Sequence, residues 1–156
     1  MTKPRWLWFA LLLSACDSTT GPHAVDQLAD ARARWLAQGG DSYTYVLTRD
    51  CLCVLSGREI SVTVENGQVV AATDAVSQLA VESAFLSYLQ TVPDLFDLID
   101  DAILRDVAAF MVSYDGTYGY PTRIEIDYSA AVADDEISFT ASNLSLSQSL
   151  SQTTAR

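Results

Sequence analysis

The sequence predicts an α+β fold, in which a single antiparallel β-sheet of about five strands has helices packed on one face. Apolar residues recur at helical spacing in two segments, the dipeptide Asn66-Gly67 joins two alternating segments, and three further alternating segments follow one another near the C-terminus. Strands joined in succession by short turns pair antiparallel, whereas parallel pairs need long crossovers. We therefore expect one α+β domain over residues 25–144.

The first helix is predicted between Val25 and the pair Gly39-Gly40, because glycine commonly follows a helix C-terminus. Its buried face is expected to comprise Val25, Leu28, Ala29, Trp35 and Leu36. Residues 43–55 then alternate and are rich in Tyr, Thr and Val, which favours a strand.

A β-hairpin is predicted around Asn66-Gly67, since this dipeptide fits a two-residue hairpin turn. Ile60, Val62 and Val64 alternate with polar residues before the turn, and residues 68–72 return after it. Residues 75–90 are compatible with a helix or with a loop, and the sequence does not decide between them.

The second helix is predicted to begin after Thr91, an N-cap residue with Asp94 three positions further on. Its buried stripe is expected to comprise Leu95, Phe96, Ile99, Ala102 and Ile103. The side chains expected to face solvent are Asp97, Asp100, Asp101 and Asp106.

Three strands complete the predicted sheet, over residues 107–114, 122–128 and 136–144. Residues 115–119 join the first two as a turn, in which Gly119 permits a positive φ. Pro121, after the turn, fixes the start of the next strand. The Ser/Gln-rich residues 145–156 are expected to fray.

The N-terminus predicts export and lipid attachment. Lys3 and Arg5 precede the apolar residues 6–13, a run far shorter than the ~20 residues that span a bilayer but typical of a signal peptide. The following Leu13-Ser14-Ala15-Cys16 resembles the lipobox of bacterial lipoproteins, which implies cleavage before Cys16 and acylation of its thiol.

We therefore expect residues 1–15 to be a signal peptide, Cys16 to carry the lipid and residues 16–24 to form a flexible tether. The protein is then expected in the cell envelope, held to a membrane outside the cytoplasm. Asp17 resembles the inner-membrane retention signal of enterobacteria, which favours the inner membrane where two membranes are present.

The charge of the cleaved chain excludes one class of partner. Residues 16–156 contain seven Arg, no Lys and 20 Asp and Glu, a formal net charge of −13. Nucleic-acid affinity depends on cationic contacts to phosphates, so nucleic acid is not expected as a partner. Anionic headgroups would also repel this surface, so membrane contact is expected through the lipid alone.

Several motifs occur together in the order of one known family. They are Tyr43-x-Tyr45, Cys51-x-Cys53, the Asn66-Gly67 hairpin, Thr91-x-x-x-Leu95-Phe96, Tyr114, Gly119-Tyr120-Pro121, Ile126-Asp127-Tyr128 and Asp134-Asp135-Glu136. Over residues 26–144 the chain resembles the bacterial domain family of unknown function DUF6174. The resemblance implies a small secreted or lipidated envelope domain with no assigned activity.

Cys51 and Cys53 are the most distinctive candidate pair. On a regular strand their Cα atoms would lie about 6.6 Å apart, near the upper limit for a disulfide, so bridging them requires a local bend. Three alternatives remain open: a structural disulfide, two reduced half-buried thiols, or a redox or metal-handling role. A closed thiolate metal site wants four ligands, and the only histidine is His23.

The sequence offers little for catalysis, and we expect neither a cofactor, a metal nor an enzymatic role. Asp97, Asp100 and Asp101 are interpreted as a solvated helical face, and residues 134–136 as a turn or strand edge with loose calcium binding as the alternative. A carboxylate-dependent hydrolase remains a minor alternative.

Tyr114, Tyr118 and Tyr120 cluster around the predicted turn. They are interpreted either as an exposed aromatic patch for a partner or as packing at the edge of the core. The sequence thus predicts a lipid-anchored envelope module with a non-catalytic binding or structural role and an envelope protein as its candidate partner, with a thiol redox or metal-handling accessory as the alternative. Ligand, partner and oligomeric state are not predicted.

Overall fold

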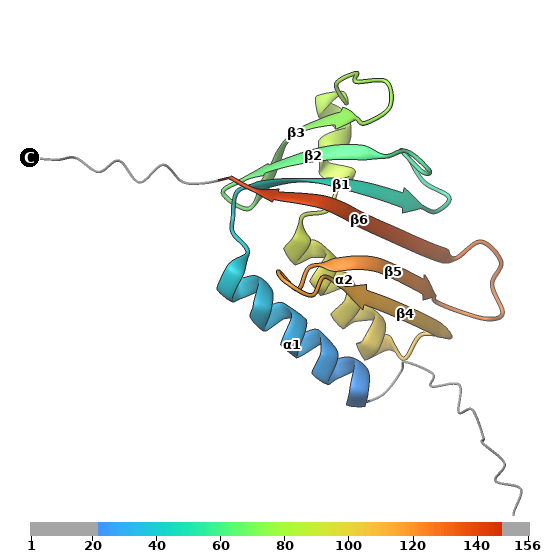
Figure 1. The fold of residues 1–156 in the computed structure, drawn as a ribbon. Helices are drawn as coiled ribbons and strands as arrows, with labels where there is room; N and C mark the ends of the chain where they lie inside the picture. Colours follow the sequence, from blue (N-terminus) through green and yellow to red (C-terminus); the bar gives the residue numbers. More distant parts are fainter. Residues whose placement is uncertain (1–21, 148–156) are drawn as a thin grey trace, which may run out of the picture.

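The computed structural model describes residues 22–147, which form two α-helices, a short 3-10 helix and six strands (Figure 1). The helices are α1 (Pro22–Gln38), η1 (Ser83–Tyr88) and α2 (Val92–Arg105). The strands are β1 (Tyr43–Asp50), β2 (Ile60–Glu65), β3 (Gln68–Asp74), β4 (Ala109–Tyr114), β5 (Pro121–Asp127) and β6 (Glu136–Leu146).

One antiparallel sheet contains all six strands in the order β3-β2-β1-β6-β5-β4. The α+β class is confirmed, but the sheet has six strands and not about five. All six segments predicted as strands enter this sheet, because β1 pairs on both sides, with β2 and with the C-terminal strand β6. The hairpin β2–β3 thereby joins the meander β4–β5–β6 in one sheet.

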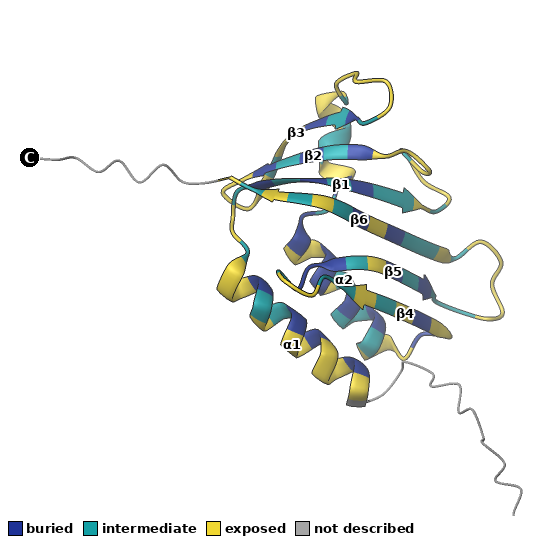
Figure 2. Cartoon of the chain, in the orientation of Figure 1, coloured by how far each residue is buried: buried dark blue, intermediate teal, exposed yellow. Residues whose placement is uncertain are grey.

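The sheet buries one face against the helices. Along β1 and β2 every second residue is buried, and β5 and β6 contribute further apolar residues to the same core (Figure 2). The buried side chains of this face include Tyr43, Tyr45, Leu47, Ile60, Val62, Val64, Ile124, Ile126 and Phe139. We call the opposite face, which α1 and α2 leave uncovered, the outer face.

Helix α1 packs with a different face from the one predicted. Its buried residues are Ala24, Leu28, Ala31 and Trp35, whereas Val25, Ala29 and Leu36 are exposed. The expected face was wrong at those three positions because two alanines, which carry little hydrophobic signal, occupy the contact. Gly119 explains why the alanine face of α1 is the buried one. A Cβ at Gly119 would lie 2.3 Å from the Ala31 carbonyl oxygen, so the turn before β5 approaches α1 directly.

Helix α2 follows the prediction closely. Thr91 caps it, accepting a hydrogen bond from the Asp94 amide while the Asp94 carboxylate accepts one from the Thr91 amide. Leu95, Phe96, Ile99 and Ala102 are buried and Ile103 is half-buried. The Tyr43 hydroxyl accepts a hydrogen bond from the Val92 amide at 2.8 Å, which joins the start of α2 to β1.

The other boundaries differ in detail from the predictions. β1 ends at Asp50 and residues 51–57 form turns, so the strand does not reach residue 55. The segment 75–90 contains a turn, an isolated bridge between Thr73 and Ala80, and η1. β6 continues to Leu146, paired with Tyr43, so the tail does not begin to fray at Ser145.

Helix α1 already begins at Pro22, so residues 22–24 belong to the domain and not to the tether. The predicted signal peptide, Cys16 and most of the tether lie outside the described residues. Within residues 22–147, no helix is long and apolar enough to cross a membrane.

Candidate functional site

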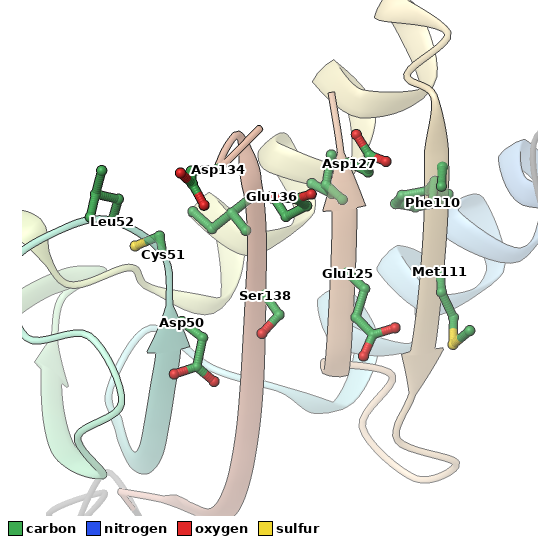
Figure 3. Close-up of a pocket in the computed structure, with 13 residues that line it drawn as sticks. Asp50, Cys51, Leu52, Phe110, Met111, Glu125, Asp127, Asp134, Glu136 and Ser138 are labelled. Atoms are coloured by element: carbon green, nitrogen blue, oxygen red, sulfur yellow. The ribbon is translucent and has the colours of Figure 1, made fainter. Parts of the chain in front are cut away.

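A groove of about 710 Å³ crosses the outer face of the sheet at the end where β1 and β5 finish and β4 and β6 begin (Figure 3). It is lined by residues 50–52, 109–111, 125–127, 134 and 136–138, and we call it the acidic groove. Its volume falls in the range of ligand-binding clefts, about 300–1,000 Å³.

Strand register builds the groove from two rows of side chains. Met111 lies opposite Glu125, Glu125 opposite Ser138, and Ser138 opposite Asp50, which forms one row across four strands. Asp127 and Glu136 are direct cross-strand partners in the next row. Because alternate residues of a strand share a face, both rows project from the outer face.

The acidic groove carries an excess of negative charge. Five lining residues are acidic: Asp50, Glu125, Asp127, Asp134 and Glu136. Within residues 22–147 only Glu125 of these five has an ion pair, with Arg123 of the same strand. Directly opposed like charges destabilise a sheet, and Asp127 faces Glu136 without a cation between them in the described part of the chain.

Exposed apolar side chains accompany this charge. Leu52 is 90% exposed and Met111 is 51% exposed, although both are large and apolar. Leu52 lies at the turn that closes one end of the groove, and Met111 lies on the edge strand β4 at the other side (Figure 3). The groove therefore offers carboxylates and apolar contact surface together.

Cys51 and Cys53 lie at the turn beside this groove. Their Sγ atoms are in contact and their Cα atoms are 5.3 Å apart, which is less than on a regular strand and within the usual range for a disulfide. The required bend is present, since the Cys53 amide donates to the Cys51 carbonyl at 2.8 Å. The Ser56 hydroxyl accepts a further hydrogen bond from the Cys51 amide at 3.1 Å.

A second acidic cluster overlaps the groove. Oxygen atoms of Asp127, Asp135 and Glu136 lie within 4.8 Å of one another. The structure thus brings Asp127 to the cluster that the sequence placed at residues 134–136. Calcium takes six to eight oxygen ligands, more than these three side chains supply as single donors.

The three candidate tyrosines do not form a continuous exposed patch. Tyr120 is 7% exposed, and the half-buried Tyr114 and Tyr118 pack against the core. The Tyr114 ring stacks on Phe96 with 6.4 Å between centroids. Burial raises the pKa of the Tyr114 and Tyr120 hydroxyls. Their positions agree with packing at the edge of the core.

The acidic face of α2 meets α1 instead of facing only solvent. Arg32 of α1 pairs with Asp97 at 3.3 Å and with Asp100 at 2.7 Å, while Arg105 pairs with Asp101 at 2.8 Å. These side chains are substantially exposed, so each pair contributes at most about 1 kcal/mol to stability. Asp97 and Asp100 therefore join the two helices, Asp101 pairs within α2, and the three line no described pocket.

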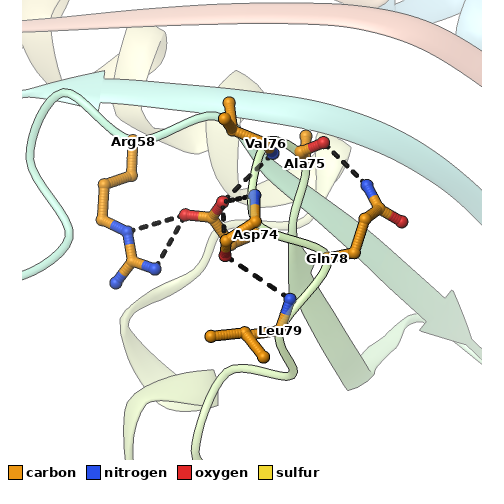
Figure 4. A network of polar contacts seen from close by, with 7 residues as sticks. Arg58, Asp74, Ala75, Val76, Gln78 and Leu79 are labelled. Atoms are coloured by element: carbon orange, nitrogen blue, oxygen red, sulfur yellow. Dashed lines mark hydrogen bonds and ion pairs between the residues drawn. The ribbon is translucent and has the colours of Figure 1, made fainter.

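One buried acid had no expected role from the sequence. Asp74, 7% exposed at the end of β3, accepts hydrogen bonds from the Ser77 amide at 2.7 Å and from Arg58 Nε at 2.9 Å (Figure 4). The Ser77 amide, followed by Arg58 and the Ser77 hydroxyl, holds the pKa of this carboxyl well below its usual range. Asp74 thus fixes the turn after β3, and the Asp-x-x-Ser pattern at 74–77 was the available signal.

Comparison with known proteins adds one match. A family model covers residues 27–146, nearly all of the described part of the chain, and the description of that family assigns it no function. No curated protein matches the chain. No solved structure matches it either.

Proposed function

The chain belongs to the family of unknown function DUF6174, and from that premise we propose that it is a lipid-anchored, non-catalytic binding module of the bacterial cell envelope. The observation that carries the binding role is the acidic groove on the outer face of the sheet. Like charges opposed across two strands and large apolar side chains left exposed both oppose stability, so a binding role gives a reason for their presence.

The proposed anchor is the lipid on Cys16, supported by the cationic start, the short apolar run and the lipobox-like Leu13-Ser14-Ala15-Cys16. Two or three acyl chains hold a protein to a membrane durably, whereas one does so only marginally. Wild-type protein should incorporate labelled palmitate and fractionate with membranes. Cys16→Ala should lose both properties, and retention of this variant in the membrane fraction would contradict the anchor.

The groove lies at the end of the domain where the described part of the chain begins. Helix α1 begins at Pro22, on the side of the domain where β1 and β5 finish (Figure 1). The chain from Cys16 to Pro22 reaches at most about 20 Å when extended. The ligand is therefore proposed to be part of the membrane surface layer or attached to it.

We propose a structural disulfide between Cys51 and Cys53. It would hold the turn that presents Leu52 to the groove. The nearest cation in sequence, Arg49, donates instead to the carbonyls of Val54 at 2.7 Å and Tyr88 at 3.0 Å. Thiolate formation is favoured by nearby cations, and the adjacent Asp50 opposes it, so this environment supports a structural role over a redox role.

Site-specific photo-crosslinking in intact cells tests the binding role. A photoreactive residue at Met111, inside the groove, should yield an adduct with an envelope component. The matched control is Leu36, which is 79% exposed on α1 and away from the groove. Adducts from Leu36 but not from Met111 would place the contact on the helical side and contradict the proposal.

A further inference from the structure

We propose that the acidic groove binds an extended segment of a partner protein in which Arg or Lys side chains alternate with apolar residues. This inference rests on the proposed binding role and names the chemistry of its ligand. Its basis is charge complementarity: five carboxylates line the groove, and within the described residues one of them is paired with a cation.

The spread of these carboxylates favours an extended ligand over a single ion. Asp50 and Glu125 lie on strands two apart in the sheet, so their Cα atoms are separated by about 10 Å. Asp127 and Glu136 form the next row along the strands, about 6.6 Å away. One cation held between Asp127 and Glu136 would leave Asp50, on β1, without a partner, whereas cationic side chains two residues apart in an extended segment repeat at the same spacing as the rows.

The apolar surface favours side chains with long hydrocarbon stems. Lys and Arg lay their methylene groups along apolar surface while the charged end reaches a polar group. Leu52 and Met111, 90% and 51% exposed, offer such surface beside Asp50 and Glu125. A small polyamine would satisfy the charge but would leave most of this apolar surface in water.

A lipid headgroup is the less favoured occupant. The described part of the chain carries 6 Arg and no Lys against 19 Asp and Glu, and the groove itself is lined by no basic residue. Anionic headgroups are therefore repelled. A basic protein segment has the opposite charge to the groove and is attracted to it.

The test measures the affinity of the full-length protein, in uncharged detergent micelles, for a fluorescent peptide that alternates Arg and Leu. The test variant is Asp127→Asn with Glu136→Gln, which removes the opposed pair. The matched control is Asp26→Asn with Asp30→Asn, two exposed positions on α1 that change the charge equally. A peptide with Glu in place of Arg, spermidine and calcium chloride serve as comparison probes.

We expect saturable binding of the Arg-Leu peptide that weakens at high salt, because exposed charge contacts are screened. The groove variant should bind about tenfold more weakly, because it loses two exposed ion pairs with the peptide, while the α1 variant binds as the wild type does. The groove variant should also keep or gain thermal stability, since it loses a like-charge pair, which separates lost binding from misfolding.

Equal weakening in both variants would mean non-specific charge attraction and would overturn the inference. Micromolar calcium binding without peptide binding would assign a metal site instead. If spermidine bound as tightly as the peptide, the apolar side chains would contribute nothing to affinity, and the proposed alternation of cationic and apolar residues would be wrong. If the basic peptide does not bind but Met111 still crosslinks to an envelope component, the ligand chemistry is wrong and the binding role stands; if neither occurs, both fail.

Discussion

Replacing Tyr43 by Phe tests how the sheet and α2 are joined. Tyr43 is 1% exposed, and its hydroxyl accepts a hydrogen bond at 2.8 Å from the amide of Val92, which is 0% exposed. Phenylalanine keeps the ring and its edge-on contact with Trp35, at 5.2 Å between centroids, but removes the acceptor. The Val92 amide is then buried without that partner, at a cost of about 1–3 kcal/mol.

Equilibrium unfolding in urea at neutral pH measures this cost. With a slope of about 2 kcal/mol per M, the midpoint should fall by roughly 0.5–1.5 M. Tyr88→Phe is the matched control, because Tyr88 is 47% exposed and surface substitutions usually change stability by no more than about 0.5 kcal/mol. Equal midpoints for the two variants would refute the role assigned to the Tyr43 hydroxyl.

Three further predictions concern the packing of α2, the buried hydroxyl of Tyr43, and the pair Cys51 and Cys53. Phe96→Ala should lower the free energy of unfolding by about 3–5 kcal/mol, whereas Asp97→Ala, at a side chain 76% exposed, loses only the exposed pair with Arg32 and should lower it by no more than about 1 kcal/mol; similar urea midpoints would mean that the phase of α2 is wrong. Burial raises the pKa of Tyr43 to about 12, above the value of about 10 expected for an unfolded tyrosine, so its contribution is complete below pH 10 and is lost as the pH rises towards 12. Urea midpoints should therefore fall over that range in the wild type and fall less in Tyr43→Phe. Reduction of the proposed Cys51–Cys53 disulfide should cost no more than about 2 kcal/mol, because the loop is so short, and the reduced thiols should react slowly with iodoacetamide at pH 7; rapid alkylation followed by mass spectrometry would favour the redox alternative.

Local signals predicted those elements whose chemistry lies within a few residues. Asn66 and Gly67 both adopt positive φ, 50° and 75°, as a two-residue hairpin turn between β2 and β3 requires. Thr91 and Asp94 form the capping interaction at the start of α2. In both cases the stabilising groups are neighbours in sequence, so the sequence pattern alone is enough to predict the structure.

The sequence-based predictions were wrong where contacts between residues far apart in the chain determine the structure. Ala31 is buried because Gly119 approaches it from 88 positions further along the chain, and no periodicity within α1 contains that contact. The pairing of β1 with β6 also cannot be predicted from neighbouring residues, because nothing in the sequence of either strand shows which strand lies beside β1 in the sheet. The early end of β1 follows from the hydrogen-bonded turn at Cys51 and Cys53.

The acidic groove could be predicted only in part. Because alternate residues of a strand share a face, the predicted strand 122–128 carries Glu125 and Asp127 together, and the acidic run at residues 134–136 is visible in the sequence. Their convergence with Asp50 depends on the register between β1, β6 and β5, which one sequence does not contain. Exposed acids at alternating positions are typical of any half-solvated strand, so they did not mark a site before the strands were paired.

The most direct test of the binding site uses Met111, the only methionine of residues 16–156. Its side chain is 51% exposed and lines the groove, so the processed protein labelled with 13C at the methionine methyl should give one signal from that position. We predict that this signal shifts saturably as the Arg-Leu peptide is added, and that Asp127→Asn with Glu136→Gln suppresses the shift. Peptide binding that leaves the Met111 signal unchanged would place the interaction elsewhere and contradict the proposed binding site.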